Sequence, residues 1–280
     1  MDFVAVAFSV TAPEKSDLLI GQLTLLGFTG FEEEPGRLTA YVPSDVFGDV
    51  RAGLEAVGAA TQLPYQIRRV PWQNWNQQWE SSFSPVRVGD FCGIRAGFHA
   101  PVEGVTHEIV ITPKMTFGTG HHATTASMIR LMETLEVRDR AGFDFGTGTG
   151  VLAILAARMG ASRLVAVDND AAAVENAREN ARENGVAERI RFFTADSASA
   201  GAVDGNLYDF ILANIQLGVI SDNLQAMAAL LTPGGRLLVS GVLLQDAPRL
   251  EAAAGGAGLV RSREIRDGGW IAWELRRRED

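Results

Sequence analysis

The stretch "DFGTGTGVLAI" (residues 144–154) joins the end of an apolar segment, a glycine-rich turn and the start of an apolar helix. The preceding letters "AGFDFG" predict a strand, and "GVLAILAARMG" predicts a helix that ends at Gly160. A glycine loop between a strand and a helix lies at the carboxyl end of a parallel sheet, where ligands bind. Gly146, Gly148 and Gly150 let the backbone turn tightly and approach a ligand. The loop therefore predicts a site for a nucleotide-like ligand.

The alternation of strands and helices continues beyond this loop. Strands are expected at "RLVAVDN", "RIRFFTAD", "YDFILANI" and "GGRLLVSGVL", with helices between them. The segments "LVRSREI" and "WIAWEL" flank "RDGG", a turn signal that predicts a terminal hairpin. We expect an α/β fold, with a doubly wound, mainly parallel sheet and a terminal antiparallel hairpin, in a domain of residues 85–280. The tandem "ARENAREN" (residues 177–184) is interpreted as an exposed helix face, not as a structural repeat.

The first seventy residues follow a different pattern. Their short elements run strand, helix, strand, strand, helix, strand, which predicts a small ferredoxin-like α+β domain over residues 1–70. Residues 71–84 then predict a linker helix, in which Trp72, Trp75 and Trp79 share one face. A partner could bind that face, but we expect it to dock on a neighbouring domain.

Polar side chains end four successive strands of the larger domain. Asp144, Asp168 and Asp196 end the first three, and Asn214 ends the fourth. Asp144 would repel a pyrophosphate but hold a cationic ammonium group. Asp168 can accept hydrogen bonds from both hydroxyls of a ribose, and Asp196 can accept one from a base amino group. Each could instead be a helix cap or turn residue, a simpler explanation that three acidic residues at successive strand ends make less attractive.

Composition restricts the class of protein further. The chain has 280 residues, of which 46% are hydrophobic and 21% are charged, so it can bury a substantial core. No apolar run approaches the ~18 residues of a membrane helix, and no targeting segment is recognised, so we expect a cytoplasmic protein without membrane attachment. The single cysteine, Cys92, excludes an intrachain disulfide. The net charge of −9 argues against direct nucleic-acid binding and allows a basic protein partner.

The letters FGTG also occur earlier, in "MTFGTGHHATT" (residues 115–125). His121 and His122 could suggest a metal site there. Adjacent side chains in an extended loop point to opposite sides, and a zinc site needs three or four arranged ligands. We therefore expect no metal, and we expect His122 to shape the loop.

Together these motifs resemble the ribosomal protein L11 methyltransferase family, a group of class I S-adenosylmethionine-dependent enzymes. That family carries a phrase similar to FGTG-x-H-P-T-T shortly before its glycine loop, and this chain has FGTGHHATT. The resemblance covers nearly the whole chain and implies a seven-stranded methyltransferase sheet. It implies S-adenosylmethionine as cofactor and places cofactor contacts on Thr125, Gly146, Asp168 and Asn214. Asp144, Gly148 and Asp196 complete the predicted cofactor site on the strength of their positions.

The resemblance also implies the reaction. Methyl groups would pass to lysine side chains or an N-terminal amine of ribosomal protein L11, the expected partner, with residues 1–70 recognising this substrate. We see no general base and assign to Asn214 the catalytic task of orienting the amine. A monomer is taken as the default. The chain departs from the family phrase at Ala123, where proline is usual, and at Thr147, where cysteine is frequent.

Three alternatives remain at this point. The chain could be a related methyltransferase that acts on another protein or on a small molecule. It could be a nicotinamide-dependent dehydrogenase, since Gly148, Gly150 and Ala153 fit the G-x-G-x-x-A spacing. Asp144 and the terminal hairpin argue against that class. A non-catalytic module that has kept the cofactor pocket is the third alternative.

Overall fold

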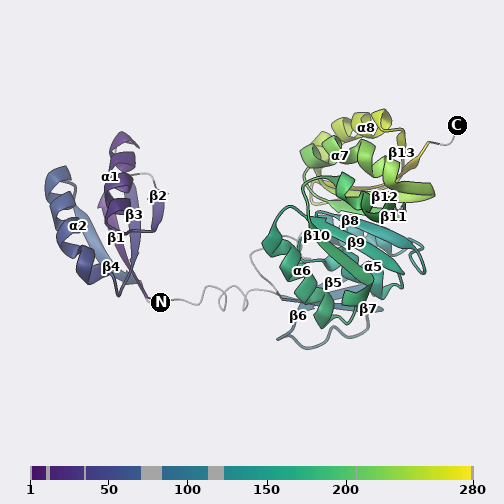
Figure 1. Ribbon diagram of the computed structural model, residues 1–280, viewed down its shortest axis with the longest axis horizontal. Coiled ribbons are helices and arrows are strands. Elements are labelled where there is room, and N and C mark those ends of the chain that lie inside the picture. Colours follow the sequence, from purple (N-terminus) through teal and green to yellow (C-terminus); the bar gives the residue numbers. More distant parts are fainter. Residues whose placement is uncertain are drawn as a thin grey trace. The chain divides into compact units, whose positions relative to one another are not determined.

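The computed structural model describes residues 2–10, 13–34, 36–70, 84–112, 123–205 and 207–278. The chain divides into two compact units, residues 1–79 and residues 80–280, which are described separately (Figure 1). The expected linker helix covers residues 71–84. Residues 71–83, which include all three tryptophans, lie outside the described residues. In the described part of the chain, no helix has the length and apolar character needed to cross a membrane.

The first unit has the predicted order of elements. Its strands and helices are β1 (Phe3–Ser9), α1 (Pro13–Leu25), β2 (Gly30–Glu34), β3 (Arg37–Pro43), α2 (Phe47–Thr61) and β4 (Tyr65–Val70). The sheet order is β2-β3-β1-β4, and every neighbouring pair is antiparallel. Apolar side chains of β1, β3 and both helices form one buried core under this sheet, including Phe8, Leu23 and Leu54.

The second unit begins with a small sheet of three strands. These are β5 (Val86–Val88), β6 (Cys92–Ala96) and β7 (His107–Ile111). β5 pairs with β6 in antiparallel fashion, and β6 pairs with β7 in parallel. One edge of β7 is therefore paired with a strand, and its other edge faces helix α6 (Ala171–Glu183).

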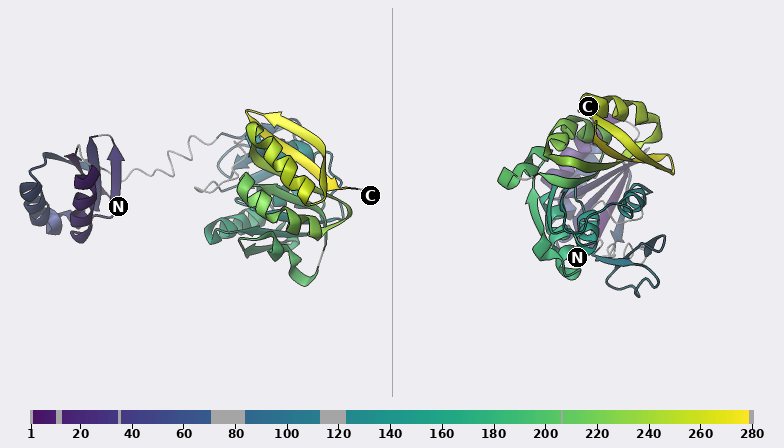
Figure 2. Two further views of the ribbon diagram at one scale, coloured as in Figure 1. Left: turned by 90° about the horizontal axis from the view of Figure 1, so that it is seen from above. Right: turned by 90° about the vertical axis from the view of Figure 1, so that its right-hand side faces the viewer.

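A seven-stranded sheet dominates the second unit, in the order β10-β9-β8-β11-β12-β14-β13. Its strands are β8 (Ala141–Phe145), β9 (Arg163–Asp168), β10 (Ile190–Thr194), β11 (Tyr208–Asn214), β12 (Leu231–Leu243), β13 (Leu259–Asp267) and β14 (Trp270–Arg277). The pairs from β10 to β12 are parallel, whereas β14 is antiparallel to both of its neighbours. The predicted terminal hairpin is therefore confirmed, and β14 inserts between β12 and β13 (Figure 2, yellow).

Helices cover both faces of this sheet (Figure 1). They are α4 (Ala123–Met132), α5 (Val151–Arg158), α6, α7 (Leu217–Leu230) and α8 (Ala247–Gly256), with short 3-10 turns at Ala187–Arg189, Ala198–Gly205 and Leu244–Asp246. Successive strand residues point to opposite faces, so Leu164 joins the core under α4, α5 and α6, and Val165 joins the core under α7 and α8. The predicted doubly wound arrangement follows from these two cores.

One prediction about helix α6 is wrong. Its tandem segment, residues 177–184, was expected to form an exposed face, but Asn180 is completely buried and Asn184 is nearly so, as is Asn176 directly before the segment. Asp170 caps the start of the helix by accepting a hydrogen bond from the Ala172 backbone N–H (2.8 Å). The arginines and glutamates of the repeat are exposed or half-buried, and the asparagines face the interior because they bond to backbone there.

Candidate cofactor and active site

The glycine loop connects β8 to α5 and is fastened to the end of β9. Backbone N–H groups of Gly146 and Thr147 both donate to the Val167 carbonyl oxygen, each at 2.9 Å. Gly146, Gly148 and Gly150 all have positive φ, at 77°, 54° and 81°. Such angles are strained for residues with a side chain, so the sequence of alternating glycines follows from the shape of the turn.

Gly146 is also required by its neighbour. A Cβ atom at this position would lie 2.2 Å from Cγ2 of Ile215, the residue that follows β11. β8 and β11 are adjacent, but the chain leaves β8 toward β9 and leaves β11 toward β12 on the opposite side. This is the switch point of the sheet, where open α/β folds bind ligands.

Asp168, the last residue of β9, holds the centre of the loop. Its Oδ2 atom accepts a hydrogen bond from the Gly148 backbone N–H (2.8 Å), and Oδ1 accepts one from the Asp170 backbone N–H (3.1 Å). A carboxylate has about four acceptor positions, so two such bonds leave capacity for the hydroxyls of a ligand. Asp168 thus fits a role in both loop shape and ligand binding.

Asp144 lies behind the loop and is only 1% exposed. Its Oδ2 atom accepts a hydrogen bond from Thr147 Oγ1 (2.6 Å), and among the described residues its Oδ1 atom has no hydrogen-bond partner. Burial raises the pKa of Asp144 to about 7, against an ordinary value of 3.8; the hydrogen bonds from Thr147 and the Ala153 backbone N–H oppose the rise, and the nearby Asp168 charge adds to it. A cationic group placed beside this carboxyl would favour its ionised form.

Thr125 and Asn214 meet on the other side of the switch point. The side-chain amide of Asn214, at the end of β11, donates to Thr125 Oγ1 in helix α4 (3.2 Å). Thr125 is buried, and Asn214 is half-buried. The "HHATT" motif and the fourth strand end therefore contribute to one place, although 89 positions separate them.

The other predicted positions are Asp196 and the histidine pair at residues 121–122. Asp196 is exposed and lies two residues beyond β10, where the Ala195 backbone N–H donates to the Asp168 carbonyl oxygen (2.8 Å). His121 and His122 lie outside the described residues, so the absence of a metal at that pair stays a prediction. Elsewhere, the described ranges contain no group of three potential metal-binding side chains.

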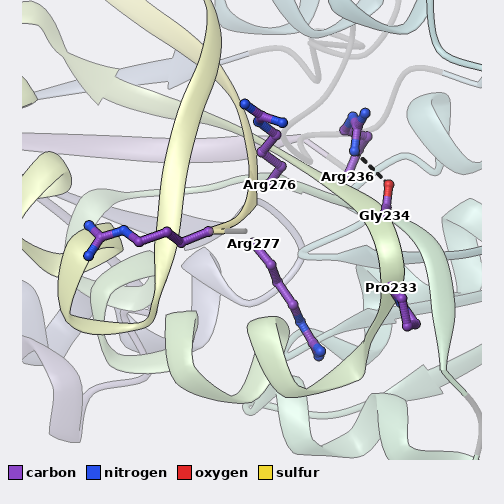
Figure 3. A pocket seen from close by; sticks show the side chains of 6 residues that line it. Pro233, Gly234, Arg236, Arg276 and Arg277 are labelled. Carbon is purple, nitrogen blue, oxygen red and sulfur yellow. Dashed lines mark hydrogen bonds between the residues drawn. The ribbon is translucent and has the colours of Figure 1, made fainter. Parts of the chain in front are cut away.

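The structure also contains a basic hollow of about 230 Å³ (Figure 3). Its lining residues are Pro233, Gly234, Arg236, Arg276, Arg277 and Arg278. Arg236 Nη1 donates to the Gly234 carbonyl oxygen (2.6 Å), near the start of β12. Asn214 pairs in register with Ser240, farther along the same strand toward its carboxyl end, so the hollow is not part of the cofactor site.

The loop and its carboxylates fit S-adenosylmethionine. The buried Asp144 Oδ1 atom lacks a partner among the described residues, which suits a ligand that carries a positive charge. The glycine loop, residues 146–150, contains no arginine or lysine of the kind that binds phosphate. With the sheet order and the antiparallel seventh strand, these features define a class I S-adenosylmethionine-dependent methyltransferase.

Comparisons with known proteins narrow this class. Residues 21–278 match the family described as "Ribosomal protein L11 methyltransferase (PrmA)". The chain is 36% identical over 285 aligned positions to the ribosomal protein L11 methyltransferase of Porphyromonas gingivalis, with 97% of each protein covered. It is 37% identical to that of Chlorobaculum tepidum, with 89% of this chain and 87% of the relative covered.

A solved structure supports the same conclusion. The ribosomal protein L11 methylase of Lactobacillus delbrueckii subsp. bulgaricus superposes with a TM-score of 0.64 at 26% identity, covering 70% of this chain and all of that one. The chain therefore belongs to the ribosomal protein L11 methyltransferase family, and its cofactor is S-adenosylmethionine. The dehydrogenase alternative is thereby removed, and the expected methyltransferase fold is confirmed.

Two residues of this site were not predicted from the sequence. Thr147 was noted only as a departure from the family, yet its hydroxyl is the hydrogen-bond donor to Asp144. Ile215 packs against Gly146 from across the switch point. A threonine three residues after a buried aspartate was a usable signal, whereas the Ile215 contact depends on strand order.

Proposed function

We propose that this protein transfers methyl groups from S-adenosylmethionine to lysine side chains and/or N-terminal amines of ribosomal protein L11. The names of the relatives support this substrate. The observation that carries the proposal is the Asn214–Thr125 hydrogen bond beside the glycine loop. It fixes a polar amide at the switch point, where an incoming amine has to be oriented.

The proposed cofactor residues are Thr125, Asp144, Gly146, Gly148, Asp168, Asp196 and Asn214. When bound, S-adenosylmethionine supplies a methyl group that its sulfonium already activates. Asp168 binds hydroxyl groups while keeping the Gly148 N–H in place, and Asp144 balances positive charge from behind the loop. Asp196, being exposed near the same edge, accepts from the base. These assignments agree with the donors and acceptors that each side chain has.

Asn214 is the residue that we assign to the amine. Its amide nitrogen donates to Thr125, which fixes the orientation of the side chain, and its carbonyl oxygen is the atom that can accept from an amine N–H. A lysine amine has an ordinary pKa of ~10.4 and must be neutral to react. Orientation and exclusion of water then account for most of the rate in this proposal, and water accepts the released proton.

The unit of residues 1–79 is the part of the chain to which we assign substrate recognition. We assign it to the ferredoxin-like class, an assignment that its β2-β3-β1-β4 sheet order supports, and give it the task of substrate recognition. The proposed domains are residues 1–70 and 85–280, joined by residues 71–84. The enzyme is proposed to be monomeric and cytoplasmic and to need no direct nucleic-acid contact; the net charge of −9 supports the last point.

The decisive experiment is a methylation assay. Purified L11 is incubated with the enzyme and S-adenosylmethionine, and intact-mass spectrometry counts the methyl groups added. We expect methylation at one or more amines. Unmodified L11, from an enzyme that binds the cofactor normally, would instead favour another protein or a small molecule as substrate.

The assignment of Thr125 has its own test. Thr125→Val preserves the shape of the side chain and removes the oxygen that receives the Asn214 amide. Loss of one hydrogen bond of about 1 kcal/mol predicts a roughly fivefold lower kcat/KM. Thr125→Ser retains the hydroxyl and should stay close to wild type. Equal activity of the valine and serine variants would remove Thr125 from the site.

A further inference from the structure

Three buried asparagines, two in α6 and one at its C-terminal cap, form a ladder along the edge of β7. Asn184 Oδ1 accepts from the Val110 backbone N–H (3.0 Å), and its Nδ2 donates to the Val110 carbonyl oxygen (2.6 Å). One turn earlier, Asn180 Oδ1 accepts from the Thr112 backbone N–H (2.8 Å). Asn176 Nδ2 donates to the Thr112 carbonyl oxygen (3.4 Å). Side-chain amides thus take the place of a neighbouring strand.

Asn180 differs from the other two because it also bonds to the glycine loop. Its Nδ2 atom donates to the Thr149 carbonyl oxygen (2.8 Å) and to Asn176 Oδ1 (2.9 Å). With the bond from Thr112, both amide hydrogens and the oxygen of Asn180 are used. Thr149 is completely buried, so its carbonyl oxygen would find no water to replace this donor.

A second contact places α6 against the same loop. A Cβ atom at Gly150 would lie 3.0 Å from the Ala177 Cβ atom, so the loop backbone packs directly on the helix. Ala177 and Asn180 are three positions apart and share a helix face. The end of the loop is therefore supported by packing at Gly150 and by hydrogen bonding at Thr149.

Thr112, whose backbone N–H donates to Asn180, connects this asparagine to a second part of the proposed site. Thr112 is the last described residue before residues 113–122, which carry the first FGTG and both histidines in the sequence. Helix α4, which begins at Ala123 directly after that segment, contains Thr125. The side-chain amide of Asn180 thus bonds both to the cofactor loop and to Thr112, after which the chain continues through residues 113–122 to the helix that contains Thr125.

We propose that Asn180 is a positioning residue for the cofactor, fixing the glycine loop through Thr149 and linking it to the end of β7 through Thr112. This rests on the assignment of the glycine loop as the cofactor loop. Asn180 itself touches no reacting atom. It acts by holding the backbone that carries Gly148, which Asp168 holds from the opposite side.

Asn184 offers a matched control one helical turn away. Its Nδ2 atom donates to two carbonyl oxygens, those of Val110 and Asn180, but not to the glycine loop. Asn180→Asp and Asn184→Asp therefore each replace an amide NH₂ that serves two acceptors with an oxygen that repels them. Both changes damage the ladder, but only the first reaches the cofactor loop.

The test measures S-adenosylmethionine binding by calorimetry and the thermal unfolding midpoint of the cofactor-free protein. Asn180→Asp should raise the Kd for S-adenosylmethionine by about tenfold or more, since a buried acceptor loses its donor. Asn184→Asp should lower the unfolding midpoint comparably while leaving Kd nearly unchanged. Asn180→Ala and Asn184→Ala, which introduce no charge, provide the same comparison if the aspartate variants do not fold.

Steady-state kinetics supply a second readout. Asn180 variants should raise KM for S-adenosylmethionine and keep most of kcat at saturating cofactor. Parallel losses of stability and affinity in the Asn180 and Asn184 variants, or an unchanged Kd for Asn180, would overturn the inference. If the wild-type protein itself failed to bind S-adenosylmethionine, the assignment of the cofactor loop would fail instead.

Discussion

At the scale of single residues, the site contains one carboxyl group that folding disfavours in its ionised form. Asp144 is buried and lies near the charged Asp168, and the hydrogen bonds that it accepts from Thr147 and from the Ala153 backbone N–H offset only part of this cost. An apolar residue in its place would spare the protein this cost. A carboxyl group at this position suits a ligand that carries a positive charge, because that charge would stabilise the ionised carboxylate.

The amount by which buried Asp144 lowers the free energy of unfolding depends on pH. Between the ordinary pKa of 3.8 and the raised pKa of about 7, the folded protein retains a proton that the unfolded chain has released. Raising the pH through this window therefore lowers the free energy of unfolding, by about 1.4 kcal/mol per pH unit at most. Above about pH 7 the penalty stays constant.

We predict that Asp144→Asn removes this dependence. The asparagine stays neutral, and its oxygen can still accept from Thr147. Between about pH 4.5 and pH 7, wild type should lose roughly 2–3 kcal/mol relative to the variant, as measured by denaturant unfolding of the cofactor-free protein at each pH. Other titrating groups, such as His107, are common to both proteins and cancel in the difference. Parallel pH profiles would mean that Asp144 is ionised at lower pH than its burial implies.

At the scale of elements, the glycine loop that follows β8 is shaped by contacts from two other strands, β9 and β11. β9 holds it through Val167 and Asp168, and Ile215 at the end of β11 fills the space that Gly146 leaves open. Gly146→Ala would add both a positive-φ strain and a clash at 2.2 Å. We expect a loss of about 1–3 kcal/mol in unfolding free energy and weaker S-adenosylmethionine binding.

Gly185→Ala is the matched control for this change. Gly185 also has a positive φ, 66°, but an added Cβ would meet nothing within 4 Å. It should lose about 1 kcal/mol from strain alone and bind the cofactor normally. If both alanine variants bound S-adenosylmethionine like wild type, the fit between Gly146 and Ile215 would matter for packing only.

Patterns along the chain predict these elements well but do not predict their partners. The strand that contains Asp144 and the helix that follows Gly150 are visible in the local hydrophobic pattern, because each needs only its own residues. The asparagines of α6 have the spacing of an exposed polar stripe. Their burial depends on the free edge of β7, where Val110 and the following residue Thr112 bond to them from 64 to 74 positions away in the sequence. Contacts across such distances require the sheet order, which local periodicity does not contain.

At the scale of the whole molecule, cofactor binding and substrate recognition are proposed to belong to different units of the chain. Every proposed cofactor residue, from Thr125 to Asn214, lies in the unit of residues 80–280. The first unit has its own core, built from residues such as Phe8 and Leu54, so it does not need the second to bury its apolar side chains. Cofactor binding and substrate recognition should therefore be separable by experiment.

We predict that residues 80–280, expressed alone, bind S-adenosylmethionine with wild-type Kd but methylate L11 poorly. Binding is retained because the glycine loop, Asp168 and the Asn180 support are all present. Methylation falls because the unit proposed to recognise the substrate is absent. Calorimetry measures the first quantity, and intact-mass spectrometry of L11 measures the second. Adding residues 1–79 as a separate chain should restore little activity, because the connection of the two units supplies a high effective concentration that mixing does not. Wild-type methylation by residues 80–280 alone would place substrate recognition in the catalytic unit instead.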